Sequence, residues 1–117
     1  MAVAQCAGRP GSFAAVYVIA AGLSMFINNS ATIAIVAPML ETMRKVGDEP
    51  IPGKYLAWTL VYAAGSCFTT PLGYQTNMMV MKDGGYTFGD FVRFGGPLQA
   101  VHAVACVLLC MAAAKFD

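Results

Sequence analysis

Three long stretches of the sequence carry no charged side chain: residues 10–40, 55–81 and 94–114. Each is longer than the roughly 20 residues that a helix needs to cross the hydrocarbon core of a bilayer. Only 11% of the chain is charged and 58% is hydrophobic, whereas a soluble domain carries roughly 25% charged residues. Because lipid offers no partner for backbone polar groups, we expect an all-α integral membrane protein that satisfies them within helices.

The charge balance and the side-chain inventory argue against two other classes of protein. A formal net charge of +1 provides no basic surface for nucleic acid. The single histidine, His102, has no acidic residue near it in the sequence, so no nucleophile–base pair can be assembled and we do not expect an enzyme. Packing of His102 against a backbone carbonyl is favoured over a role in proton coupling.

The first stretch contains a polar interruption, FINNSATIAIVAP at residues 26–38. An unbroken helix over residues 13–40 would be about 42 Å long, against a hydrocarbon core of roughly 30 Å. A break at Asn28–Ser30 leaves two arms of about 20 Å, the second starting at Ala31, and neither arm spans. We therefore predict a re-entrant helical hairpin over residues 11–43 with its polar tip at mid-membrane depth. The alternative is a polar kink that holds two spans together by hydrogen bonds.

The second stretch is also interrupted, and the third is not. Polar residues and Pro71 crowd the middle of residues 55–82, and proline removes a backbone donor and breaks helices. We predict a discontinuous helix that stops near Thr70, runs extended through Asn77 and restarts briefly. The alternative is a turn outside the membrane between two short helices. Residues 94–114 are expected to form an ordinary transmembrane helix, so that residues 1–117 form one transmembrane unit.

Interrupted helices at membrane depth have a recognisable chemistry. Non-helical backbone is tolerated there only where it is buried in protein or lines a watery cavity. Helix N-termini present N–H groups with partial positive charge, which bind anions without lysine or arginine. Carbonyl groups released by unwinding bind Na⁺, and secondary transporters combine the two at mid-membrane. The two interruptions therefore predict a transport site.

Two motifs carry a resemblance to a known family. SCFTTPLGYQTNMMV at residues 66–80, followed by GGYTFGDFVRFGGPL at 84–98, resembles the C-terminal signature of the divalent anion:sodium symporter family. FINNSATIAIVAPM at 26–39 resembles that family's hairpin-tip motif. Together the matches cover residues 13–112. Ser30 stands where threonine is commoner, and Lys82–Asp83 replaces a glycine–proline pair.

The resemblance implies a fold and a set of site residues. The family builds its site from two inverted repeats, each with a hairpin and a broken helix, and only the second repeat matches this chain. Carried onto this sequence, the substrate-binding residues are Asn29, Ser30, Tyr74 and Gln75. The sodium-binding residues, which act partly through backbone carbonyls, are Ser24, Asn29 and Gly73.

The resemblance also implies a function and partners. It indicates the C-terminal part of a sodium-coupled symporter for a small divalent anion, sulfate or a dicarboxylate, in a multi-pass protein of the plasma membrane. The expected partners are Na⁺, the lipid bilayer and the missing N-terminal repeat or a full-length protomer, and the complete protein is expected to be a homodimer. The alternatives are a non-transporting remnant or partner subunit, and a relative that handles arsenite or exchanges sodium for protons.

Overall fold

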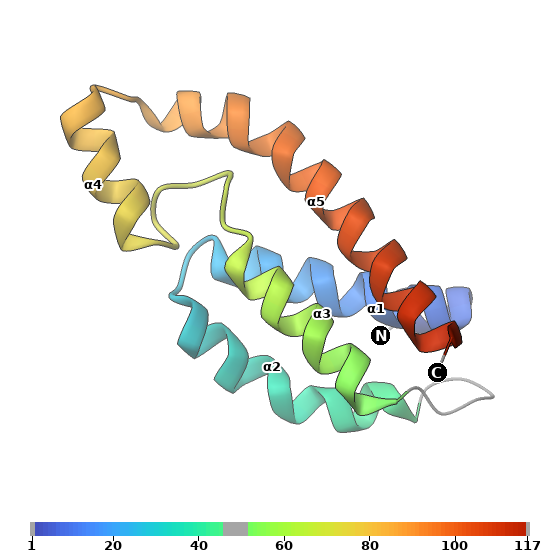
Figure 1. The fold of residues 1–117 in the computed structure, drawn as a ribbon. Coiled ribbons are helices and arrows are strands. Elements are labelled where there is room, and N and C mark those ends of the chain that lie inside the picture. The colour runs from blue at the N-terminus through green and yellow to red at the C-terminus, as the bar shows by residue number, and fades with distance from the viewer. Residues whose placement is uncertain (1, 46–51, 117) are drawn as a thin grey trace.

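The computed structural model describes residues 2–45 and 52–116, and every regular element among them is a helix. The five helices are α1 (Ala2–Ser24), α2 (Asn29–Arg44), α3 (Gly53–Gly65), α4 (Gln75–Gly84) and α5 (Phe88–Phe116). In Figure 1, α1, α2, α3 and α5 lie lengthwise in one bundle, while α4 stands apart at one end. The all-helical prediction is confirmed.

A small apolar core holds the bundle together. α1 packs against α2, α3 and α5, and α3 packs against α2 and α5. Three of these helices supply fully buried apolar side chains, among them Phe13, Val16 and Ala20 of α1, Val36 of α2, and Leu56, Leu60 and Ala63 of α3. α4 buries none of its residues, so its position depends on the segment that connects it to α3.

The first interruption lies between α1 and α2. α1 has 23 residues from Ala2 to Ser24, so it is about 34 Å long and not the short arm of about 20 Å that we predicted. α2 begins at Asn29 rather than at Ala31. Asn28 explains this start, because its Oδ1 accepts a hydrogen bond from the Ala31 N–H at 2.8 Å and thereby caps the helix. The depth of this turn in a bilayer, and hence a re-entrant hairpin, stays a prediction.

The second interruption lies between α3 and α4, at residues 66–74, earlier than we predicted. α3 stops at Gly65 rather than near Thr70, because the N–H and hydroxyl of Ser66 both donate to the Ala63 carbonyl, at 3.2 and 2.8 Å. α4 begins at Gln75 rather than after Asn77. We call residues 66–74 the unwound segment.

α5 is longer than the predicted span of residues 94–114, since it runs from Phe88 to Phe116 through Pro97. Its start is fixed by Thr87 and Asp90: the Asp90 carboxylate accepts the Thr87 N–H at 2.9 Å, and the Thr87 hydroxyl accepts the Asp90 N–H at 3.4 Å. This reciprocal pair is a capping box. Among the described helices, α5 alone is both long and apolar enough to cross a membrane.

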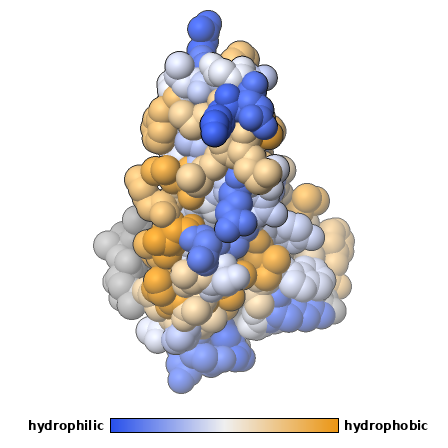
Figure 2. Space-filling view, turned by 90° about the vertical axis from the view of Figure 1, so that its left-hand side faces the viewer, coloured by the Kyte–Doolittle hydropathy of each residue, from blue (hydrophilic) through white to orange (hydrophobic). Residues whose placement is uncertain are grey.

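Apolar side chains are widely exposed on the bundle. Val101, Val104, Leu108 and Leu109 of α5 are each more than half exposed. Figure 2 views the end of the molecule where α4 lies: apolar surface covers much of its middle, and hydrophilic residues gather at the top, at the bottom and in one central patch. Exposed apolar surface of this extent indicates contact with lipid or with other protein.

Candidate functional site

Three helix ends meet on one side of the bundle, the left of Figure 1. They are the C-terminal ends of α1 and α3 and the N-terminal end of α2; the start of α4 lies on the same side, although α4 itself packs against none of these helices. Ser24 connects the three ends: its hydroxyl lies 2.8 Å from Asn29 Oδ1 of α2 and within hydrogen-bond distance of the Ala64 carbonyl of α3. We call Ser24, Asn29, Ala64 and Gly73 the helix-end junction.

The oxygen atoms of the junction form a small cluster around Ser24. The Ser24 hydroxyl carries one hydrogen but has two oxygen neighbours, Asn29 Oδ1 and Ala64 O. It donates to one of them and presents a lone pair to the other. Hydroxyl, amide and carbonyl oxygens are ligands that hard cations prefer, so the donor set fits Na⁺.

Gly73 brings the unwound segment against the end of α1. It is buried, and a Cβ atom at this position would collide with the Ser24 carbonyl oxygen. Close by, the Thr70 hydroxyl donates to the Met25 carbonyl at 2.6 Å. Glycine is required at such a close backbone approach. The structure therefore brings together all three residues of the predicted sodium set, Ser24, Asn29 and Gly73, although their binding of sodium stays a prediction.

The remaining residues of the predicted substrate set are exposed at the two helix starts. Ser30 is exposed in the first turn of α2, Gln75 is exposed at the first position of α4, and Tyr74 is 48% exposed directly before it. Tyr74 has an extended backbone and makes no side-chain cap of α4. The first backbone N–H groups of α4 are thus free of a side-chain acceptor from their N-cap. Their role in substrate binding also stays a prediction.

A buried hydrogen-bond network joins α1 and α5 to the first residues of the unwound segment. Tyr17 Oη lies 3.0 Å from Ser66 Oγ and 2.7 Å from His102 Nδ1. Gln99 Nε2 donates to Tyr17 Oη at 3.2 Å and to Ser66 Oγ at 3.0 Å, and its Oε1 accepts the Phe68 N–H at 3.3 Å. Sequence analysis missed Tyr17 and Gln99, and it expected His102 to pack against a carbonyl. The signal was present, since a glutamine in an apolar span needs partners.

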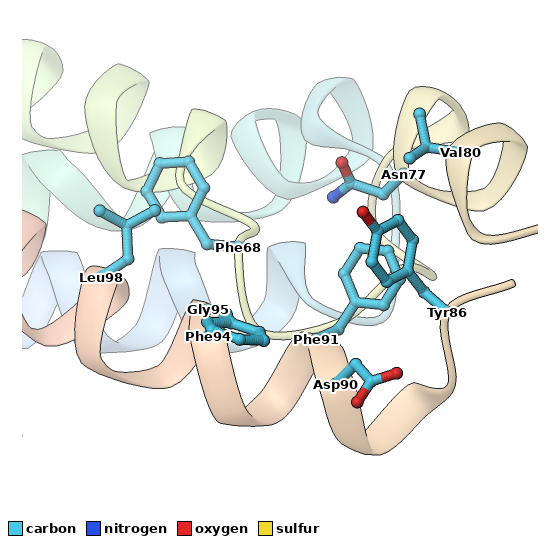
Figure 3. Close-up of a pocket in the computed structure, with 9 residues that line it drawn as sticks. All are labelled: Phe68, Asn77, Val80, Tyr86, Asp90, Phe91, Phe94, Gly95 and Leu98. Atoms are coloured by element: carbon cyan, nitrogen blue, oxygen red, sulfur yellow. The ribbon is translucent and has the colours of Figure 1, made fainter. Parts of the chain in front are cut away.

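A cavity of about 500 Å³ lies between the unwound segment, α4 and α5. In Figure 3 its labelled side chains are mostly aromatic or aliphatic, and Asn77 and Asp90 supply the polar groups. Asn77 Nδ2 also donates to the Cys67 carbonyl at 3.0 Å, which ties α4 to the unwound segment. None of the six predicted site residues lines this cavity, so it is separate from the helix-end junction.

An apolar helical chain whose interrupted helices meet end to end, with carbonyl groups and helix N-termini converging, has the architecture of a membrane transporter. Comparison with known proteins agrees: the chain belongs to the citrate transporter family, whose model matches residues 2–115. This membership, together with the sodium/sulfate cotransporters among its relatives, confirms the resemblance to divalent anion:sodium symporters. A transporter family indicates a carrier rather than an enzyme.

Three relatives illustrate the match. The chain is 41% identical over 89% of its length to a putative sulfur deprivation response regulator of Chlamydomonas reinhardtii. It is 35% identical over 81% of its length to an uncharacterized transporter, sll0640, of Synechocystis. It is 34% identical over 82% of its length to probable sodium/sulfate cotransporter 3 of Chlamydomonas reinhardtii. The aligned part is 17%, 15% and 11% of these relatives, respectively. No solved structure matches.

Proposed function

We propose that this chain forms the C-terminal part of a sodium-coupled symporter for a small divalent anion, with sulfate or a dicarboxylate as substrate. The observation that carries the proposal is the helix-end junction, where Ser24 joins the C-terminal ends of α1 and α3 to the start of α2. Two relatives are named as sodium/sulfate cotransporters, which supports sodium as the coupling ion and sulfate as the substrate. The family description names citrate, a carboxylate, and supports the dicarboxylate alternative.

The polarity of the four helix ends assigns each ion to its own side. The C-terminal ends of α1 and α3 carry partial negative charge, and the N-terminal ends of α2 and α4 carry partial positive charge. Sodium binds at the carbonyl side, with Ser24, Asn29 and the backbone next to Gly73 as ligands. The anion binds at the N–H side, with Asn29, Ser30, Tyr74 and Gln75. Because Asn29 is common to both sets, sodium bound there orders the start of α2 and prepares the anion site.

The proposed partners of this chain follow from the predicted site residues that it leaves exposed. Ser30, Tyr74 and Gln75 are exposed, and a charged solute needs a site closed from all sides before it crosses lipid. The opposite half of the site is supplied by the N-terminal repeat of the same carrier or by a full-length protomer, and the complete carrier is a homodimer in the plasma membrane. A partner subunit that does not itself transport is the second candidate, because the exposed residues need an opposing surface in that case as well.

Substitution of Asn29 tests the proposal. The complete carrier is reconstituted in liposomes, and uptake of labelled sulfate or succinate is measured with and without an inward sodium gradient. Asn29→Ala removes the oxygen that faces Ser24 and is expected to reduce sodium-dependent uptake to background. Thr42→Ala, an exposed polar position near the other end of α2, serves as the control and is expected to leave uptake unchanged.

Each result has one meaning. Wild-type uptake by Asn29→Ala overturns the assignment of the site. If uptake by the wild-type carrier does not depend on the sodium gradient, the proposal of sodium symport is overturned. Sodium-dependent uptake by the 117-residue chain alone would contradict the half-site, because the exposed residues would then need no opposing repeat. Uptake that persists at the wild-type level when this chain is omitted overturns the proposal that it forms part of the transport site.

A further inference from the structure

We propose that Gln99 of α5 is a positioning residue that holds the unwound segment in its sodium-binding shape, an inference that rests on the proposed function. Gln99 lies in the apolar third stretch of the sequence, and its side chain is buried, with 8% exposure. It touches neither of the predicted ion sets. It acts through Ser66 and Phe68, the first and third residues of the unwound segment.

The hydrogen bonds of Gln99 use both ends of its amide group. Nε2 donates to Ser66 Oγ at 3.0 Å and to Tyr17 Oη at 3.2 Å, and Oε1 accepts the Phe68 N–H at 3.3 Å. Two donors and one acceptor are therefore engaged, which fixes the orientation of the amide. A single side chain thus joins α1, α5 and the unwound segment in the interior of the bundle.

The unwound segment needs this support because it lacks helical hydrogen bonds. The Phe68 N–H has no helical partner, and a buried donor without an acceptor costs free energy. Gly95 brings the backbone of α5 against Phe68 (Figure 3), since a Cβ atom at Gly95 would collide with the Phe68 carbonyl. α5 therefore holds Phe68 twice, through the Gln99 acceptor and through the close approach at Gly95.

The segment that Gln99 holds leads directly to the sodium side of the junction. Ser66 follows the end of α3 and caps it through the Ala63 carbonyl. The next carbonyl, that of Ala64, faces the Ser24 hydroxyl. A shift of Ser66 therefore moves the Ala64 oxygen and changes the sodium site first. Tyr74 and Gln75 lie at the far end of the unwound segment, where Thr70 and Gly73 attach it to the end of α1.

The test separates sodium affinity from anion affinity in the reconstituted carrier. Gln99→Met keeps the size of the side chain and removes its three hydrogen bonds. The half-saturating sodium concentration is expected to rise about tenfold, which corresponds to the loss of a buried hydrogen bond. The KM for the anion at saturating sodium is expected to stay within about twofold. Val101→Ala, at an exposed position of the same helix, is the control and is expected to change neither value.

Two further measurements make the role specific. Hydrogen exchange at the Phe68 amide is expected to speed up about tenfold in Gln99→Met, since its acceptor is gone. Ser66→Ala removes the partner of Nε2 and is expected to raise the half-saturating sodium concentration as well. The double variant is expected to show less than the sum of the two effects, because the two substitutions remove one hydrogen bond in common. If Gln99→Met does not accumulate in the membrane, Ser66→Ala supplies the same affinity comparison.

The outcomes distinguish this inference from the proposed function. If wild-type uptake depends on sodium but Gln99→Met and Ser66→Ala keep the wild-type half-saturating sodium concentration, the positioning role is overturned and the proposed function stands. Equal loss of sodium and anion affinity, or lower uptake with both affinities unchanged, shows a merely structural role and also overturns it. Wild-type uptake without sodium dependence overturns the proposed function, and this inference with it.

Discussion

Substitution of Gly73 by alanine places one methyl group at the closest backbone approach of the junction. A Cβ atom at Gly73 would collide with the Ser24 carbonyl oxygen, since Cβ contacts under 3.0 Å are essentially never seen in proteins. The unwound segment must therefore retreat from the end of α1 by about 1 Å. Overpacking of this kind costs about 1–3 kcal/mol of folding free energy.

The expected effect on transport is larger than the effect on stability. A misplacement of about 1 Å in a positioned site costs on the order of 100-fold in rate, and the Gly73 shift separates the unwound segment from Ser24. We expect the initial rate of sodium-driven uptake of labelled sulfate or succinate, normalised to the amount of carrier in the membrane, to fall about 100-fold in Gly73→Ala.

Gly22→Ala is the matched control. Gly22 lies in the last turn of α1, and a Cβ atom there meets nothing within 4 Å. Alanine is also the better helix former, so Gly22→Ala is expected to transport at the wild-type rate or close to it. An uptake rate of Gly73→Ala within about threefold of Gly22→Ala would refute the close approach as a functional feature.

Two further predictions concern stability, and both are checked by thermal unfolding of the detergent-solubilised carrier. Gly95→Ala is expected to lower the free energy of unfolding by about 1–3 kcal/mol, because its Cβ would collide with the Phe68 carbonyl. Gly96→Ala is the control, since a Cβ atom at Gly96 meets nothing within 4 Å. Equal unfolding midpoints for the two variants would contradict this packing. Asn28→Ala is expected to cost about 1 kcal/mol through loss of the α2 cap, and an unchanged midpoint would show that the cap contributes nothing.

The general positions of the two interruptions were predictable from the sequence, because length and breaker residues decide them. The first two uncharged stretches are longer than a bilayer needs, and Pro71 cannot continue a helix. The exact boundaries were harder to predict. Ser66 ends α3 early by bonding back to Ala63, and serine side chains compete with helical hydrogen bonds in a way that depends on what else they contact.

The start of α5 shows a local signal that was overlooked. Thr87 and Asp90 have the spacing of a capping box, and they start the helix before Gly95–Gly96–Pro97. Proline at position 97 loses one helical hydrogen bond, but the helix continues through it. Capping by side chains therefore outweighed the breaker residues here, and Asp90 belongs to the first turn of the helix.

The glutamine in the apolar span indicated that Gln99 needs partners, but which partners it finds could not be predicted from local patterns. Tyr17 and Gln99 are 82 residues apart in the sequence, and their contact depends on how α1 and α5 pack. The predicted sodium residues were grouped by resemblance, and the structure brings Ser24, Asn29 and Gly73 together for a physical reason: the hydrogen bond across the α1–α2 turn and the absence of a side chain at Gly73.

Spin labels placed at the two helix starts, in the complete carrier in lipid bilayers, test the central claim most directly. Ser30→Cys and Gln75→Cys are labelled with a nitroxide in a background in which the native cysteines are replaced, and relaxation by oxygen and by a water-soluble nickel chelate gives depth and water contact. The account predicts that both labels lie near the bilayer centre and are still reached by the chelate, because they line a watery site between interrupted helices. Labels at the depth of the lipid headgroups or in bulk water, or central labels that only oxygen reaches, would contradict it.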